Sequence, residues 1–121
     1  MGLFTVDEAR EVLAELLPVL DEIVTLRGRA AELSADLASG AGPTPDGGLP
    51  ELKGMHARLD ELMTRVQETG AELKGFAPLL VDFPSDLADG TPVHLCWLEG
   101  DRELAWYHRQ DLGFPGRRPL P

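Results

Sequence analysis

Three polar residues in the carboxyl-terminal half of the chain stand at positions where chemistry is expected. Asp82 interrupts the hydrophobic run LLVDFP, and a carboxylate in such surroundings needs a partner or a proton to offset its desolvation. His108 ends the apolar stretch ELAWYH, and Glu72 lies in the last turn expected for a helix, where the helix dipole disfavours an acid. Carboxylate and imidazole groups bind iron, manganese and zinc. Glu72, Asp82 and His108 are therefore the candidate metal ligands.

The same three residues also have ordinary structural explanations. A histidine at the end of a strand can hydrogen-bond to a neighbour, and Asp82 can accept from turn amides before Pro84. Glu72 can be a solvated surface acid. No spacing such as H-x-x-x-H or E-x-x-H fixes two of the three on one face of an element. The pattern alone does not decide between a metal site and structural roles.

Two further groups of side chains could bind a ligand or react. Arg117 lies in the tail GFPGRRPLP and can clamp a carboxylate or phosphate, and with Trp106 it is the candidate ligand-binding set. Cys96 lies two residues after His94, but such neighbours on one strand lie side by side, so a thiol nucleophile pair is not expected. The sequence contains no glycine-rich phosphate loop, nucleophile elbow or dinucleotide fingerprint.

Two amphipathic helices are expected to precede these residues. The motif TVDE predicts a capping box that starts a helix at Thr5, and apolar residues then recur at helical spacing to about Ala38. Pro18 lies inside this pattern. Because proline lacks the amide donor and crowds the preceding turn, it predicts a kink, with a complete break as the alternative.

The second helix follows a flexible connector rich in glycine and proline at residues 39–50. Pro50 suits the first turn of this helix, which is expected to end near Gly75. Its heptad of apolar residues comprises Leu52, Met55, Leu59, Leu62, Val66 and Leu73. The two helices predict an antiparallel hairpin over residues 1–75. The small remainder of the chain is too short to cover both apolar stripes, which predicts a homodimer; the alternative is a monomer whose sheet lies over the stripes.

Residues 76–121 predict a small antiparallel sheet with an extended tail. The run LLVDFP reads as one short strand, and VHLCWL and ELAWYH form a β-hairpin around the tight turn EGDR. If Leu98 faces Glu103 across that turn, one face of the hairpin is the core face. That face would carry Val93, Leu95, Trp97, Leu104, Trp106 and His108. The fold class is therefore α+β, a long helical hairpin followed by a β-hairpin plus one short strand, in a single domain over residues 1–121.

The charge and cysteine content narrow the classes of partner. A net charge of −10 opposes binding to phosphate backbones and to anionic membranes. No apolar run reaches the length of a membrane span, and the single cysteine cannot form an internal disulfide. We therefore expect a cytoplasmic protein with no nucleic-acid or membrane partner.

Several short motifs occur in a combination typical of one family. They are E-L-K-G, L-V-D-F-P, L-C-W-x-x-G, W-Y-H and G-F-x-G-R-x-P-L, in that order. With its opening helix FTVDEAREVLAELLPVL, the chain resembles the uncharacterised prokaryotic family named domain of unknown function 2203. The chain departs from the family pattern by its long connector at residues 39–50. The resemblance implies no activity, substrate or catalytic residue.

Two functions remain open at this point. The first is a small acidic accessory module, a dimer that docks a protein partner and performs no chemistry. The second is a metal-binding or small-ligand-binding protein, with a metal-dependent enzyme as one form of it. Its site would lie where the second helix meets the sheet and would use Glu72, Asp82 and His108.

Overall fold

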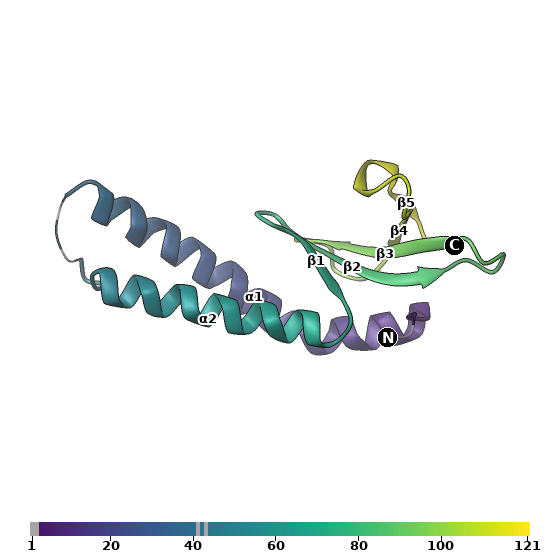
Figure 1. Cartoon of the computed structure of the whole chain (residues 1–121), viewed down its shortest axis with the longest axis horizontal. Coiled ribbons are helices and arrows are strands. Elements are labelled where there is room, and N and C mark those ends of the chain that lie inside the picture. The colour runs from purple at the N-terminus through teal and green to yellow at the C-terminus, as the bar shows by residue number, and fades with distance from the viewer. Residues whose placement is uncertain (1–2, 41, 43) are drawn as a thin grey trace. The chain divides into compact units, whose positions relative to one another are not determined.

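The computed structural model describes residues 3–40, 42 and 44–121, which form two helices and a five-stranded sheet (Figure 1). The helices are α1 (Val6–Ala38) and α2 (Leu49–Glu68), and a 3₁₀ turn, η1, spans Phe114–Gly116. The strands are β1 (Glu72–Phe76), β2 (Leu79–Asp86), β3 (Pro92–Leu98), β4 (Trp106–Arg109) and β5 (Arg118–Pro119). The α+β class is confirmed. The prediction of a β-hairpin plus one short strand was incomplete, because the sheet has five strands.

The chain divides into two compact units. One comprises residues 1–17 and 66–121, and the other comprises residues 18–65. The first unit, called the sheet unit below, holds all five strands, and the second, the hairpin unit, holds most of both helices. That the whole chain behaves as a single domain stays a prediction.

The hairpin unit buries the apolar stripes that the sequence predicts. Side chains from α1 and α2 that are almost fully covered are Leu20, Ile23, Leu26, Ala30, Leu33, Leu52, Met55, Leu59 and Leu62. Arg58 also pairs with Glu22 across the two helices, with 2.8 Å between Nε and Oε2. The stripes are thus covered within one chain, so the premise behind the predicted homodimer does not hold. The homodimer itself stays a prediction.

The capping box at the start of α1 is confirmed. The backbone amide of Thr5 donates to Oε1 of Glu8 over 2.9 Å, and the amide of Glu8 donates to the Thr5 hydroxyl over 3.1 Å. The helix continues through Pro18, so the alternative of a complete break is wrong. Downstream, the connector includes positions 41 and 43, which lie outside the described residues, and its predicted flexibility stays a prediction.

The predicted end of the second helix is wrong. Helix α2 ends at Glu68, and Glu72 lies in strand β1 rather than in a helical turn. Gly70 adopts a φ of 93°, a left-handed conformation that cannot continue a helix, and the Thr69 hydroxyl donates to the Val66 carbonyl at the helix end. The segment ELKGF then pairs with β2, so Leu73 belongs to the sheet and not to the helical stripe.

The strands follow one another across the sheet in the order β1-β2-β3-β4-β5, and every neighbouring pair is antiparallel. The loop between β3 and β4 spans residues 99–105, longer than the tight turn expected from EGDR. Asp101 organises this loop, since its Oδ2 accepts from the Leu98 amide and its carbonyl accepts from the Trp97 indole, both over 3.0 Å.

The longer loop shifts the register of the hairpin by one residue from the predicted one. Cys96 faces Trp106, and His94 faces His108. A shift of one residue moves every side chain to the opposite face of a strand. The prediction that Trp106 and His108 share the core face with Leu95 is therefore wrong.

The core face of the sheet unit contacts the first turns of α1. Phe4 packs edge-on against Phe83, with 5.3 Å between ring centroids, and the Phe4 amide donates to the Pro84 carbonyl over 2.8 Å. The Ser85 hydroxyl donates to the Phe4 carbonyl over 2.6 Å, and Arg10 donates two hydrogen bonds to the Leu104 carbonyl. These bonds fix the amino-terminal segment on one face of the sheet.

Stability should depend on the buried hairpin stripe. Leu62 is fully covered, whereas Leu49, also on α2, keeps 55% of its surface exposed. We expect Leu62→Ala to lower the free energy of unfolding by about 2–5 kcal/mol, because it leaves a cavity. Leu49→Ala should change it by less than about 0.5 kcal/mol. Urea denaturation followed by circular dichroism measures both values, and equal losses in the two variants would contradict the described burial.

Candidate functional site

Five side chains capable of acid–base or metal chemistry lie on one face of the sheet, opposite the core face. In register, Glu72 on β1 faces Asp82 on β2, which in turn faces Cys96 on β3. One step along, His94 on β3 faces His108 on β4. Directly facing residues and residues two apart on a strand share a face, so four strands contribute to one cluster. We call these five residues the polar cluster.

Asp82 and His108 form the buried centre of the polar cluster. Each is 3% exposed, and Nε2 of His108 lies 3.1 Å from Oδ2 of Asp82. The other ring nitrogen, Nδ1, lies 3.1 Å from the backbone carbonyl of Arg109. Because a carbonyl only accepts hydrogen bonds, Nδ1 carries a proton. A neutral His108 ring then presents the lone pair of Nε2 to the Asp82 carboxylate, so this contact needs one more proton or a cation.

His94 approaches the same carboxylate from the neighbouring strand. Its Nδ1 lies 4.0 Å from Oδ2 of Asp82, and its Nε2 lies 3.6 Å from Oε1 of Glu72. The His94 and His108 ring centroids are 5.3 Å apart. Burial lowers the pKa of His94, and the nearby carboxylates only partly oppose this shift, which favours the neutral ring. Both imidazoles therefore direct one nitrogen toward Asp82 and the other toward an outer acceptor.

Cys96 completes the buried part of the cluster. Its side chain is fully covered, and burial, followed by the negative charge of Asp82, raises the pKa of the thiol to about 12. One ligand atom from each of Asp82, Cys96 and His108 lies within 4.8 Å of the other two. Within the described part of the chain, Oδ1 of Asp82 is buried without a hydrogen-bond partner. These three residues thus bring oxygen, sulfur and nitrogen donors to one point.

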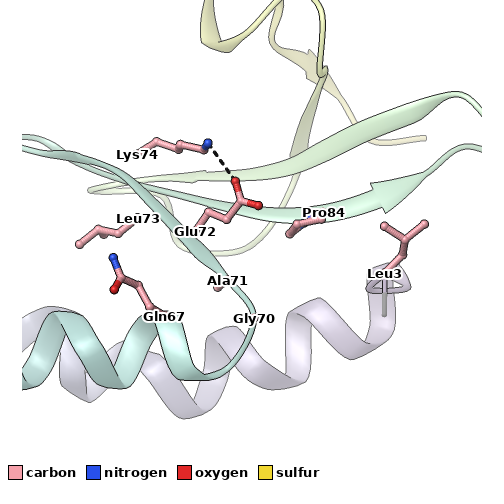
Figure 2. Close-up of a pocket in the computed structure, with 8 residues that line it drawn as sticks. All are labelled: Leu3, Gln67, Gly70, Ala71, Glu72, Leu73, Lys74 and Pro84. Atoms are coloured by element: carbon pink, nitrogen blue, oxygen red, sulfur yellow. Dashed lines mark ion pairs between the residues drawn. The ribbon is translucent and has the colours of Figure 1, made fainter. Parts of the chain in front are cut away.

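Glu72 lies at the rim of the cluster rather than at its centre. Its Oε1 pairs with Nζ of Lys74 over 2.9 Å, and its side chain is 41% exposed. This ion pair raises the pKa of Lys74, which stays protonated. Both residues line a pocket of about 560 Å³, where Figure 2 shows them projecting from β1 with their charged groups joined.

Of the three predicted metal ligands, the structure thus brings Asp82 and His108 into contact. It places Glu72 at the rim of the polar cluster, next to His94. Sequence reasoning missed His94 and the role of Cys96 in the cluster. The alternation of VHLCWL does place those two on one face, but assigning Asp82 and His108 to that same face required the correct register.

The predicted ligand-binding pair, Arg117 and Trp106, is engaged within the chain. The Arg117 guanidinium lies over the Trp106 ring, 4.7 Å from its centroid, and 5.5 Å from the centroid of Phe114. It also pairs with Asp101 of the β3–β4 loop. These contacts, together with η1 and the pairing of β5 with β4, order the tail that was expected to be simply extended. Ligand binding by Arg117 and Trp106 stays a prediction.

Comparison with protein families agrees with the motifs of the sequence. The family model described as an uncharacterized conserved protein, DUF2203, matches residues 2–120. The chain belongs to this family. Neither a curated protein nor a solved structure matches it. In the described part of this DUF2203 chain, neither helix is long and apolar enough to cross a membrane.

The thiol of this DUF2203 protein should be inert in the folded state. Because Cys96 is fully buried and its pKa is about 12, almost no thiolate is present or accessible at pH 8. We expect Ellman's reagent to react with less than about a tenth of the thiol in an hour, and with all of it after denaturation in guanidinium. Fast, complete reaction with the native protein would contradict the burial of Cys96.

Proposed function

We propose that this protein binds a divalent transition-metal ion in the polar cluster. The ligands in this proposal are the carboxylate of Asp82, Nδ1 of His94, Nε2 of His108 and the thiolate of Cys96. Glu72, the third ligand suggested by the sequence, is instead a residue that orients His94.

The observation that carries the proposal is the orientation of the two imidazoles. Nδ1 of His108 donates to the carbonyl of Arg109, and Nε2 of His94 faces Glu72, so the inner nitrogen of each ring faces Asp82. Metal-binding histidines commonly donate their outer N–H to a carbonyl or carboxylate, which fixes the tautomer and directs the lone pair at the ion. His108 has this arrangement, and His94 has a looser form of it, because its Nε2 lies 3.6 Å from Oε1 of Glu72, beyond hydrogen-bond distance.

Charge supports the same conclusion. Asp82 is buried, and the ion-pair partners within 4 Å of it, over the residues that the structure describes, are the two histidines. A buried carboxylate is costly unless a positive charge compensates it. A bound cation would provide that compensation.

The donor set favours zinc or ferrous iron over manganese. A thiolate is a soft ligand, and imidazole suits both zinc and iron, whereas manganese prefers carboxylate and water oxygens. The proposed set of one oxygen, two nitrogens and one sulfur has the number of ligands typical of zinc, and three of the four, from Asp82, Cys96 and His108, lie within 4.8 Å of one another. Zinc is therefore the first probe.

The metal-stripped protein, purified without a histidine tag, should bind one equivalent of Zn²⁺ with a dissociation constant of about 1 µM or tighter. Asp82→Asn and His108→Ala should each weaken binding at least about 100-fold, since each removes a ligand. Glu72→Gln should weaken it only about tenfold, because Glu72 acts through His94. Competition with a zinc indicator measures these constants.

His56 provides the matched control, because it is the third histidine of the chain and is exposed on α2. His56→Ala should bind zinc like the wild type. Circular dichroism of each variant shows whether it has folded. Absence of zinc binding in the wild type, or equal binding in folded Asp82→Asn and the wild type, would refute the proposal.

Zinc affinity should rise with pH. The metal-free thiol is protonated, with a pKa of about 12, and must lose its proton to become a ligand. Each proton released on binding makes the affinity about tenfold higher per pH unit. Calorimetry between pH 6.5 and 8.5, in buffers of different ionisation enthalpy, counts these protons. Cys96→Ser should release about one proton fewer; an unchanged count would remove Cys96 from the ligand set.

A further inference from the structure

We infer that the metal ion exchanges through the pocket beside β1, where Glu72 receives the incoming cation and Lys74 opposes its passage. This inference rests on the proposed metal site and concerns how that site is filled and emptied.

The solvent-exposed fraction of the side chains increases from the centre of the polar cluster, at Asp82, to its rim, at Glu72. Asp82, Cys96 and His108 are at most 3% exposed. The His94 side chain is 13% exposed, and the Glu72 side chain next to it is 41% exposed. Glu72 is also the one member of the cluster that lines the 560 Å³ pocket. Solvent therefore reaches the buried donors by way of Glu72 and His94.

The surroundings of this path attract cations. A second hollow of about 390 Å³ adjoins the pocket, since both hollows are lined by Leu3 and Gly70. Its walls carry Glu8 and Glu11. With Glu72, three carboxylates thus face the two hollows, and a concave surface lined by one sign of charge raises the local concentration of the opposite ion.

Among the described residues that line these two hollows, Lys74 is the one with a positively charged side chain. Its ammonium group lies 2.9 Å from Oε1 of Glu72, the carboxylate oxygen that also lies 3.6 Å from His94. An incoming cation therefore meets a positive charge already paired with the first carboxylate on its path. Lys74 is exposed, so its side chain can leave without disturbing the core. The pair acts as a barrier that slows exchange and does not block it.

The test uses stopped-flow mixing of metal-stripped protein with Zn²⁺ at low ionic strength, together with the equilibrium constant for each variant. Lys74→Met should raise the association rate about three- to tenfold, because it removes a positive charge close to a divalent ion. Glu72→Gln should lower the association rate and raise the dissociation rate. Both differences should shrink in 0.5 M salt, where surface charges are screened.

Lys53 is the other lysine of the chain and provides the matched control, because Lys53→Met changes the net charge equally but lies in the hairpin unit. Its association rate should stay within twofold of the wild type. If Lys74→Met and Lys53→Met associate at the same rate while zinc binding still requires Asp82, this exchange route is wrong and the metal site stands. If the wild type binds no zinc, the metal site and the route are both wrong.

Discussion

Asp82 lies inside the sheet with two histidines as its ion-pair partners, and the strand register determines that arrangement. Side chains in a sheet alternate between faces, so one residue of slip would turn His108 away from the carboxylate and toward the core. Asp82 would then be buried with less compensation, at a cost of several kcal/mol. The polar cluster therefore forms only in this register, and the contacts of Asp82 in turn stabilise this register over a shifted one.

Much of the helical part could be predicted from the sequence because its signals are local. The capping box at Thr5 and the apolar stripes depend on residues three or four apart, and the structure contains both. The end of α2 was harder to predict from the sequence. A heptad position at Leu73 suggested more helix, but the left-handed conformation of Gly70 and pairing with β2 outweighed it. Strand pairing, here with the next strand along the chain, is not encoded in the residue spacing that predicts a helix.

The polar cluster could be predicted only in part for the same reason. Asp82 stood out because a carboxylate within an apolar run is unusual, and His108 because it ended another. The sequence groups the two only as candidate ligands of one metal ion, beside separate structural explanations for each. His94 and Cys96 were assigned to the face opposite His108, because the length of the β3–β4 loop depends on how Asp101 folds it. A conformation fixed by side-chain bonds within a loop lies beyond what residue spacing predicts.

The sheet unit is discontinuous in sequence, because residues 18–65 separate its two segments. The hydrogen bond between Ser85 and Phe4 joins residues 81 positions apart, whereas the hairpin unit is one continuous stretch. During synthesis the hairpin emerges and can form early, while the amino-terminal segment must wait for β2. If the chain folds as it is synthesised, the sheet unit, which carries the acids and histidines of the cluster, is completed last.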